Sequence, residues 1–210
     1  MKRLTGSLAA LAIAATGLGT AAPAQAQASD ATSLVTVLTS DGNRFDKNSK
    51  DFDIVTEAAL AIVEANPDSA VAALADADAR LTAFVPTDQA FRKLAKDLTG
   101  KSIRSEKKVF TTLVEAAGVD TIEQVLLYHV VPGATLRSGK VLASDGAALK
   151  TAQGAKVKVK VAGGKTPKIT LVDRDKDAPD ATVVLSAIDL NKPNKQIAHG
   201  IDRVLRPIDL

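Results

Sequence analysis

The sequence contains no cysteine and no tryptophan, and aromatic residues make up only 3% of its 210 residues. Without cysteine the chain has no disulfide, no thiolate metal ligand, no cysteine nucleophile and no lipid-modified N-terminal cysteine. With so few aromatic rings, its core must consist mainly of Ala, Val, Leu and Ile, which the hydrophobic content of 46% can supply. Stability must therefore come from burial of aliphatic side chains, in one domain or in two small ones.

A strong excess of either charge is also missing, since the formal net charge is only +3. Two of the positive charges, Lys2 and Arg3, stand at the start of the chain and precede an apolar run, Leu8–Leu18. The small residues of Ala24-Gln25-Ala26 follow, which completes the order of a secretory signal peptide. We predict that residues 1–26 are a signal peptide cleaved after Ala26, and that the remainder is secreted to the extracellular space.

Cleavage after Ala28 is the alternative processing site, and an uncleaved membrane anchor is the alternative to cleavage. The anchor is disfavoured because the apolar run is short and rich in Ala, Gly and Thr. Cleavage after Ala26 removes two positive charges and no acid, which lowers the net charge from +3 to +1. A nearly neutral protein lacks the basic face that nucleic-acid phosphates require. No second hydrophobic segment of spanning length follows, so we expect neither a nucleic-acid partner nor a transmembrane segment in the mature chain.

The sequence LTAFVPTDQAFRKL, residues 81–94, predicts a buried strand that passes through a tight turn into a helix. Phe84 lies in an apolar and β-branched run that Pro86 ends, because proline has no N–H to donate to a sheet. Thr87 is a good helix N-cap, and Phe91 begins the apolar face of the helix that follows. The stretch contains no nucleophile–base pair and no phosphate-binding glycines, so its predicted role is architectural.

Helices are predicted before this stretch and directly after it, and most of the strands follow later. Ser33, Asp51 and Ser105 are the predicted caps of three helices, and Asp120 with Glu123 has the spacing of a capping box for another. The predicted helical segments are 34–38, 52–65, part of 69–79, 88–98, 106–117 and 120–127, and the predicted strands are 81–85, 128–131, 148–152, 156–161, 168–172, 181–188 and 197–205. Helices first and an antiparallel sheet afterwards is the α+β pattern.

Three stretches in this order resemble the motifs of the fasciclin-like (FAS1) domain, a family of extracellular adhesion modules. Leu81–Leu94 resembles the first homology block, with its Phe-x-Pro-Thr-x-x-Ala-Phe pattern. Leu126–Leu136, LLYHVVPGATL, resembles the Tyr-His motif, and Ile197–Pro207, IAHGIDRVLRP, resembles the second homology block. Any one block alone is a weak signal, whereas three in order at domain-sized spacing behind a signal peptide are specific.

The resemblance implies a single fasciclin-like domain over residues 34–210, of the single-domain secreted bacterial type, after a flexible lead-in at residues 27–33. It implies N-terminal helices packed on an antiparallel β-wedge or sandwich. It further implies a non-catalytic adhesion or binding module whose partner is a cell-surface, extracellular-matrix or cell-wall protein or polysaccharide. No cofactor is implied.

The resemblance also assigns roles to individual residues. Tyr128 and His129 occupy the motif that some animal relatives use for receptor binding, although their apolar neighbours favour a structural role. The residues with an implied structural role are Phe84, Pro86, Thr87, Phe91, His199 and Asp202. Two positions depart from the family pattern: Lys195-Gln196 replaces the usual Asn-Gly before the last strand, and Gly200 replaces a β-branched residue, which could loosen the strand or admit a bulge.

Candidate ligand sites each have a simpler interpretation. His129 and His199 are the only histidines, and no acidic third ligand has helical or hairpin spacing beside either, so we expect no metal site. Asp173, Asp175 and Asp177 alternate like a calcium loop, but Ala178 and Val184 replace its required Gly and Glu, which favours a solvated turn.

The basic cluster of Lys156, Lys158, Lys160, Lys165 and Lys168 favours a solvated face or a protected edge strand, with binding of an anionic polymer as the alternative. The sequence has no serine elbow, zinc-binding helix or phosphate loop. We therefore predict that the protein is not an enzyme. The alternative function is a secreted hydrolase or carbohydrate-active protein that uses carboxylates scattered along the chain, for which a deep pocket holding two carboxylates of raised pKa would be the sign.

Overall fold

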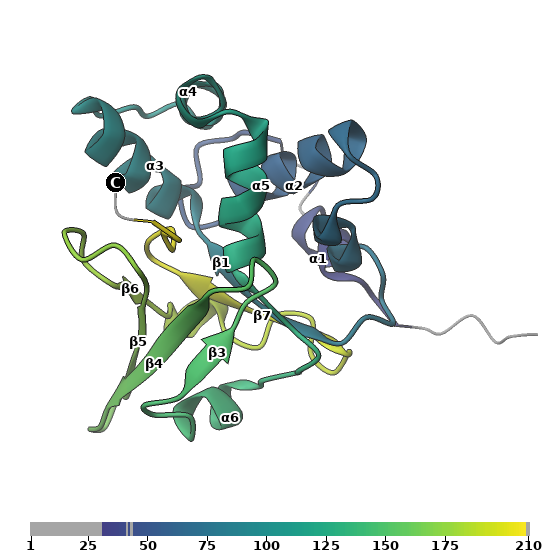
Figure 1. Cartoon of the computed structure of the whole chain (residues 1–210), viewed down its shortest axis with the longest axis vertical. Coiled ribbons are helices and arrows are strands. Elements are labelled where there is room, and N and C mark those ends of the chain that lie inside the picture. The colour runs from purple at the N-terminus through teal and green to yellow at the C-terminus, as the bar shows by residue number, and fades with distance from the viewer. Residues whose placement is uncertain (1–30, 41, 43, 209–210) are drawn as a thin grey trace, which may run out of the picture. The chain divides into compact units, whose positions relative to one another are not determined.

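Helices dominate the first part of the chain and strands the second, as the sequence predicted (Figure 1). The computed structural model describes residues 31–40, 42 and 44–208, so the predicted signal peptide lies outside the described residues. The helices are α1 (Leu34–Leu38), α2 (Asp53–Ala65), the 3₁₀ helix η1 (Ala70–Leu74), α3 (Asp88–Thr99), α4 (Glu106–Ala117), α5 (Val119–Tyr128), α6 (Ser138–Leu142) and the 3₁₀ helix η2 (Leu185–Ala187). The strands are β1 (Leu81–Pro86), β2 (Val130–Pro132), β3 (Ala148–Lys150), β4 (Lys156–Ala162), β5 (Lys168–Val172), β6 (Ala181–Thr182) and β7 (Gln196–Ile201).

The strands form two sheets. A three-stranded sheet has the order β2-β1-β7, and a four-stranded sheet has the order β3-β4-β5-β6. The second sheet is antiparallel throughout, as predicted. In the first sheet β1 pairs antiparallel with β2 but parallel with β7, in a register that runs from Leu81 opposite Gln196 to Pro86 opposite Ile201. The prediction of antiparallel pairing is wrong for this pair, because the long connection between β1 and β7 returns the last strand in the direction of the first.

The three-stranded sheet separates two hydrophobic cores. Along β1, Leu81, Ala83 and Val85 pack with the helices, whereas Phe84 packs with the four-stranded sheet. Successive side chains of a strand point to opposite faces, so one strand serves both cores. Figure 1 shows the same arrangement, with α1 to α5 on one side of β1 and β7 and the strands β3 to β6 on the other. This is the predicted α+β class with helices packed on a β-wedge.

Local capping residues account for several helix starts. Ser33, Thr87 and Ser105 each accept a hydrogen bond from the backbone N–H three residues later, at α1, α3 and α4. A side-chain oxygen at the N-cap satisfies one of the four N–H groups that a helix start leaves unpaired. These three starts were predicted from the sequence at the correct residue.

Two other predicted caps are wrong. At α5 the N-cap is Gly118, Asp120 lies in the first turn, and Glu123 instead accepts a hydrogen bond of 2.5 Å from Ser69 Oγ. At α2 the cap position is Phe52 rather than Asp51. The first N–H groups of α2 are instead bound by a side chain of α3, that of Asp88.

The chain leaves α5 later than predicted. Tyr128 is the last residue of that helix, and the N–H of His129 still bonds to Leu126 O at 3.0 Å. Strand β2 begins only at Val130 and includes Pro132. Tyr128 and His129 therefore end a helix, and the prediction that they open a strand is wrong.

The C-terminal half contains further differences. Helix α6 was not predicted, and the predicted strand 181–188 shortens to Ala181–Thr182, followed by η2. The predicted strand 197–205 ends at Ile201. The 3₁₀ helix η2 packs closely against β7, and Gly200 in β7 permits this contact. A Cβ built on Gly200 would lie 2.8 Å from Ala187 Cβ, so glycine permits a close approach and does not loosen the strand.

Among the described residues, no helix combines the length and the apolar character that crossing a bilayer requires.

Candidate functional site

The three stretches that resemble fasciclin motifs meet in one sheet. The first supplies β1 and the start of α3, the second the end of α5 and β2, and the third β7 and the residues after it. Because the sheet order is β2-β1-β7, stretches that lie far apart in sequence become hydrogen-bonded neighbours. Their common location is the boundary between the two hydrophobic cores, which gives the motifs a shared structural role.

Tyr128 is fully buried, with 0% of its surface exposed. Its hydroxyl donates a 3.0 Å hydrogen bond to Lys156 O at the start of β4. Burial raises the pKa of Tyr128 to about 12, because the charged phenolate is disfavoured away from water. The side chain thereby joins α5 to the four-stranded sheet and presents no polar atom to a partner.

His129 is also buried, at 3% exposure, and both ring nitrogens bind backbone groups. Nε2 accepts a 2.9 Å hydrogen bond from the Leu205 N–H, so Nδ1 is the donor in the 2.7 Å contact with Val125 O. Burial lowers the pKa of His129 to about 4, because the imidazolium would be desolvated. The ring is held neutral in one tautomer at neutral pH.

His199 and Asp202 lie on the third stretch. His199 is 1% exposed, accepts a 3.3 Å hydrogen bond from the Asp189 N–H at Nδ1, and contacts Leu136 O at 2.7 Å through Nε2. Burial lowers its pKa as well. Asp202 accepts a 2.7 Å hydrogen bond from the Thr182 N–H, which joins β6 to the end of β7. The two histidines thus have separate backbone partners.

The remaining residues with a predicted structural role also lie inside the fold. Phe84 and Phe91 are 1% and 5% exposed, Pro86 is the last residue of β1, and Thr87 caps α3. Each contributes to the passage from β1 into α3.

The loop with calcium-like spacing is organised by an arginine. The Asp175 carboxylate is buried, accepts hydrogen bonds from the N–H groups of Asp177 and Ala178, and pairs with Arg206 at 2.8 Å. Both oxygens of this carboxylate therefore have partners, and the guanidinium also pairs with Asp97. The basic cluster lies on the exposed face of β4. Lys156, Lys158 and Lys160 point outward, whereas Val157 and Val159 are buried, which is the predicted alternation.

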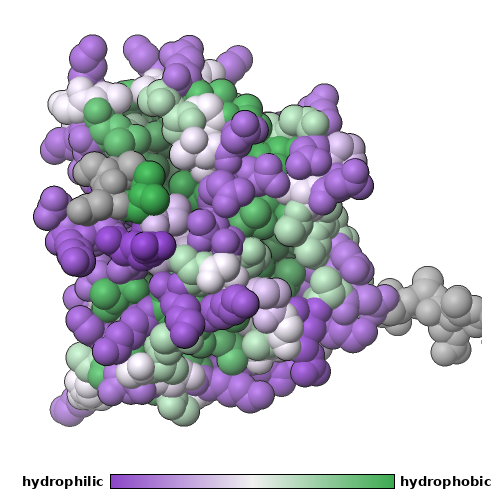
Figure 2. Space-filling model, in the orientation of Figure 1, coloured by the Kyte–Doolittle hydropathy of each residue, from purple (hydrophilic) through white to green (hydrophobic). Residues whose placement is uncertain are grey.

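An apolar groove of about 780 Å³ lies between the helices and the C-terminal segment. Apolar side chains gather over this part of the molecule in the upper half of Figure 2. Its rim carries unusually exposed apolar residues, with Leu98 at 42% and Ile208 at 55% exposure. The groove is lined among others by Phe91, Leu94, Leu98, Phe110, Leu113 and Ile208. Its lining includes a single acid, Asp120.

A cluster of carboxylates was missed by the sequence analysis. Asp53, Asp88 and Glu106 are the first residues of α2, α3 and α4, and Asp46 and Asp51 lie on the loop before α2. Asp88, at the start of α3, binds the start of α2. Its two side-chain oxygens accept hydrogen bonds from the N–H groups of Asp53 at 3.3 Å and Ile54 at 2.9 Å. This carboxylate does the capping that the sequence assigned to Asp51. Acidic residues at three helix starts were visible in the sequence, but their convergence depends on the tertiary fold.

Burial raises the pKa of two carboxyls in this cluster. The pKa of Asp88 rises to about 8 through burial, with a hydrogen bond to Asp51 and the charges of Glu106 and Asp51 adding to the effect. Burial raises the pKa of Glu106 to about 7, although the Arg92 guanidinium opposes that shift. Arg92 binds Glu106 Oε1 at 2.8 Å.

The sequence matches the family model of the fasciclin domain over residues 55–207. The chain belongs to the fasciclin domain family. A similar solved structure is a pair of FAS1 domains from fasciclin I, an insect cell adhesion molecule, with 17% sequence identity and a TM-score of 0.54. The comparison covers 83% of this chain and 51% of that chain, so the present protein spans about half the length of the domain pair. Among curated proteins no match was found.

The family membership confirms what the three sequence stretches indicated. The matched region begins within α2 and ends after β7, so it contains most of the helical core and all of the core of the four-stranded sheet. The likeness to the insect domain pair confirms the predicted fold class.

Proposed function

We propose that this fasciclin domain protein is secreted and acts as a non-catalytic adhesion or binding module for a cell-surface, extracellular-matrix or cell-wall partner, either a protein or a polysaccharide. The observation that carries the proposal is the family match over residues 55–207. The likeness of the fold to a domain pair from an insect cell adhesion molecule supports it.

The alternative is a secreted hydrolase that uses scattered carboxylates. Its expected sign is a deep pocket that holds two carboxyls of raised pKa. Asp88 and Glu106 do have raised pKa values, but neither lines the apolar groove, and Asp88 is occupied by two backbone N–H groups. This separation between the perturbed acids and the large cavity favours the binding module.

The partner surface is proposed to lie outside the Tyr128–His129 motif. Both side chains are buried and use their polar atoms on backbone groups, so a partner reaches them only if the fold opens. In this proposal the two residues support binding indirectly, by holding β1, α5 and the last segment in place.

The test uses secreted protein and a cell-surface extract. N-terminal sequencing of exported material should find a start near Gln27, whereas intact Met1 on cytoplasmic protein would contradict export. Immobilised mature protein should retain a defined surface component that a thermally unfolded sample does not retain. Absence of any folded-state-dependent binding, together with hydrolysis of a glycan or ester substrate, would support the alternative function.

The His129→Ala variant separates the structural role from direct contact. Binding should be measured at a temperature where unfolding curves show that the variant is fully folded. Under the proposal it then binds like the native protein. Lost binding by a fully folded variant would place His129 in the partner site. A Lys158→Gln variant is the matched control, because it changes a residue on the exposed face of β4.

A further inference from the structure

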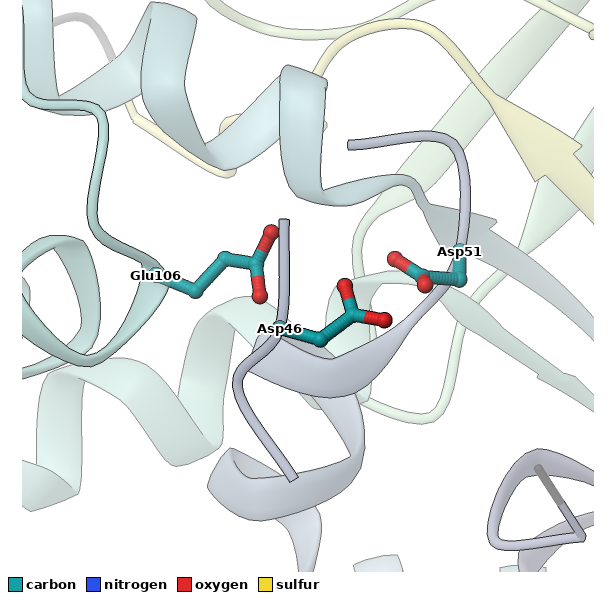
Figure 3. Close-up of side chains that lie close together, drawn as sticks. All are labelled: Asp46, Asp51 and Glu106. Carbon is teal, nitrogen blue, oxygen red and sulfur yellow. The ribbon is translucent and has the colours of Figure 1, made fainter. Parts of the chain in front are cut away.

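The loop before α2 carries two carboxylates toward the starts of three helices. Figure 3 shows Asp46 and Asp51 facing the carboxylate of Glu106, which comes from the first turn of α4. One carboxylate oxygen of each residue lies within 4.8 Å of those of the other two. Three like charges at this separation repel one another, so the arrangement favours a positive charge between them.

Glu106 gives an independent indication of a ligand. Its side chain is 0% exposed, and it points into the cluster. Oε1 pairs with Arg92, but Oε2 is buried and accepts no hydrogen bond from any of the described residues. A buried carboxylate oxygen without a partner carries the full cost of its desolvation, and a bound cation would remove that cost.

We propose that Asp46, Asp51 and Glu106 bind a calcium ion. Carboxylate oxygens are the ligands that hard divalent cations take, and calcium binds them at about 2.3–2.6 Å. Two oxygens on opposite sides of such an ion lie about 4.6–5.2 Å apart, so the separations within this cluster can be spanned by one calcium ion.

The charges and the exposure of the site agree with this cation. With Glu106 ionised by the bound ion, the three carboxylates and the Arg92 guanidinium sum to two negative charges, which one divalent ion balances. Asp46 and Asp51 are half-buried, so solvent reaches their side and water can complete the six to eight oxygen ligands that calcium takes. Magnesium fits less well because it demands near-ideal octahedral geometry, which a loop and one helix start do not impose.

The calcium ion would tie the loop that precedes α2 to the start of α4. The loop already contacts α2, because the Asp46 N–H donates to the Asp53 carboxylate at 3.2 Å. Binding would therefore stabilise the helical half of the fold. This inference does not rest on adhesion, since its readouts are metal affinity and thermal stability.

The experiment titrates calcium chloride into the full chain after removal of metals with a chelator, and follows the heat of binding. We expect one site per chain with a Kd of about 10⁻⁴–10⁻³ M, the range of extracellular calcium modules. Calcium at about 10 mM should raise Tm by about 3 °C or more relative to sodium chloride of equal ionic strength. The same concentration of magnesium should raise Tm by less than half as much.

Three variants assign the binding to this cluster. Asp46→Asn and Glu106→Gln should each weaken calcium binding by about tenfold or more, and should lose most of the rise in Tm. Asp177→Asn is the matched control, because Asp177 lies in the other acidic loop, and it should bind like the native chain. If Glu106→Gln does not fold, Asp46→Asn decides, since Asp46 lies in a loop with a half-buried side chain.

Several results would overturn the proposal. They are no binding heat and no calcium-dependent rise in Tm, native affinity in Asp46→Asn, or lost affinity in Asp177→Asn. An equal rise in Tm with magnesium would overturn the assignment to calcium.

Discussion

At the level of single residues, His129 connects three segments of the chain. Its ring bonds Val125 O in α5 and the Leu205 N–H beyond β7, and its backbone oxygen accepts a 2.9 Å hydrogen bond from the Phe84 N–H in β1. Each of these groups is buried or partly buried, so removing the ring leaves polar atoms without partners. The neutral imidazole is the only histidine form that can both donate and accept here.

Replacing His129 with alanine should lower the free energy of unfolding by about 1–3 kcal/mol at pH 7.5, the cost of leaving buried partners unsatisfied. The difference should shrink as the pH falls. The unfolded histidine takes up a proton near pH 6.5, whereas the folded one resists it down to a pKa of about 4. The contribution of His129 is thus fully present well above pH 6.5. By pH 4, proton uptake by the unfolded chain opposes it by about 3 kcal/mol, which cancels or reverses the difference between the two proteins.

Denaturant unfolding of both proteins at pH 7.5 and pH 4.5 tests this prediction. Because the variant lacks only this titrating group, the pH dependence of all other residues cancels in the difference. A gap between the two proteins that stays constant with pH would show that His129 is not held neutral.

The partners of His129 show what the sequence could not supply. Its apolar neighbours indicated burial, and a buried histidine needs hydrogen-bond partners. The actual partner Leu205 lies 76 residues further along the chain, and only the packing of α5 against the last segment brings it within reach.

At the level of elements, those with local signals were predicted well. Alternating Lys and Val placed β4 correctly, and the caps Ser33, Thr87 and Ser105 placed three helix starts. The errors arose where a distant residue provides the deciding contact. Asp51 is adjacent to α2, yet Asp88, 35 residues from Asp53, binds the first N–H groups of that helix. The acidic cluster was missed for the same reason.

Close packing of η2 against β7 is an element-scale feature that depends on Gly200. We expect Gly200→Ala to destabilise the protein by about 1–3 kcal/mol, because its Cβ would lie 2.8 Å from Ala187 Cβ and 3.3 Å from Phe52. Gly139→Ala is the matched control, since a Cβ there meets nothing within 4 Å and α6 would gain a better helix former.

Thermal or denaturant unfolding of the two variants shows whether the loss of stability comes from close packing at Gly200 or from any replacement of glycine by alanine. The double variant Gly200→Ala with Ala187→Gly should recover part of the loss, because it removes the clashing methyl group. Equal losses in Gly200→Ala and Gly139→Ala would contradict the packing explanation.

At the level of the whole molecule, the two cores share the three-stranded sheet. Phe84 points from β1 into the core of the four-stranded sheet, where its ring lies 5.9 Å from that of His199. Phe91 begins the apolar face of α3 in the helical core. A strand whose two faces belong to different cores makes the stability of one core depend on the other. The three sequence motifs converge on this sheet, so the family pattern marks the part of the fold on which both halves rely.

Phe84→Ala and Phe91→Ala should each lower the free energy of unfolding by about 3–5 kcal/mol, because both side chains are almost fully buried. Leu98→Ala is the control, since 42% of that side chain is exposed, and it should cost less than about 1 kcal/mol. Unfolding followed by helix circular dichroism and by the fluorescence of the single tyrosine, Tyr128, should give coincident transitions in all three variants, because the shared sheet couples the cores. A loss below about 1 kcal/mol for Phe84→Ala, or separate transitions for the two signals, would mean that β1 does not couple the cores.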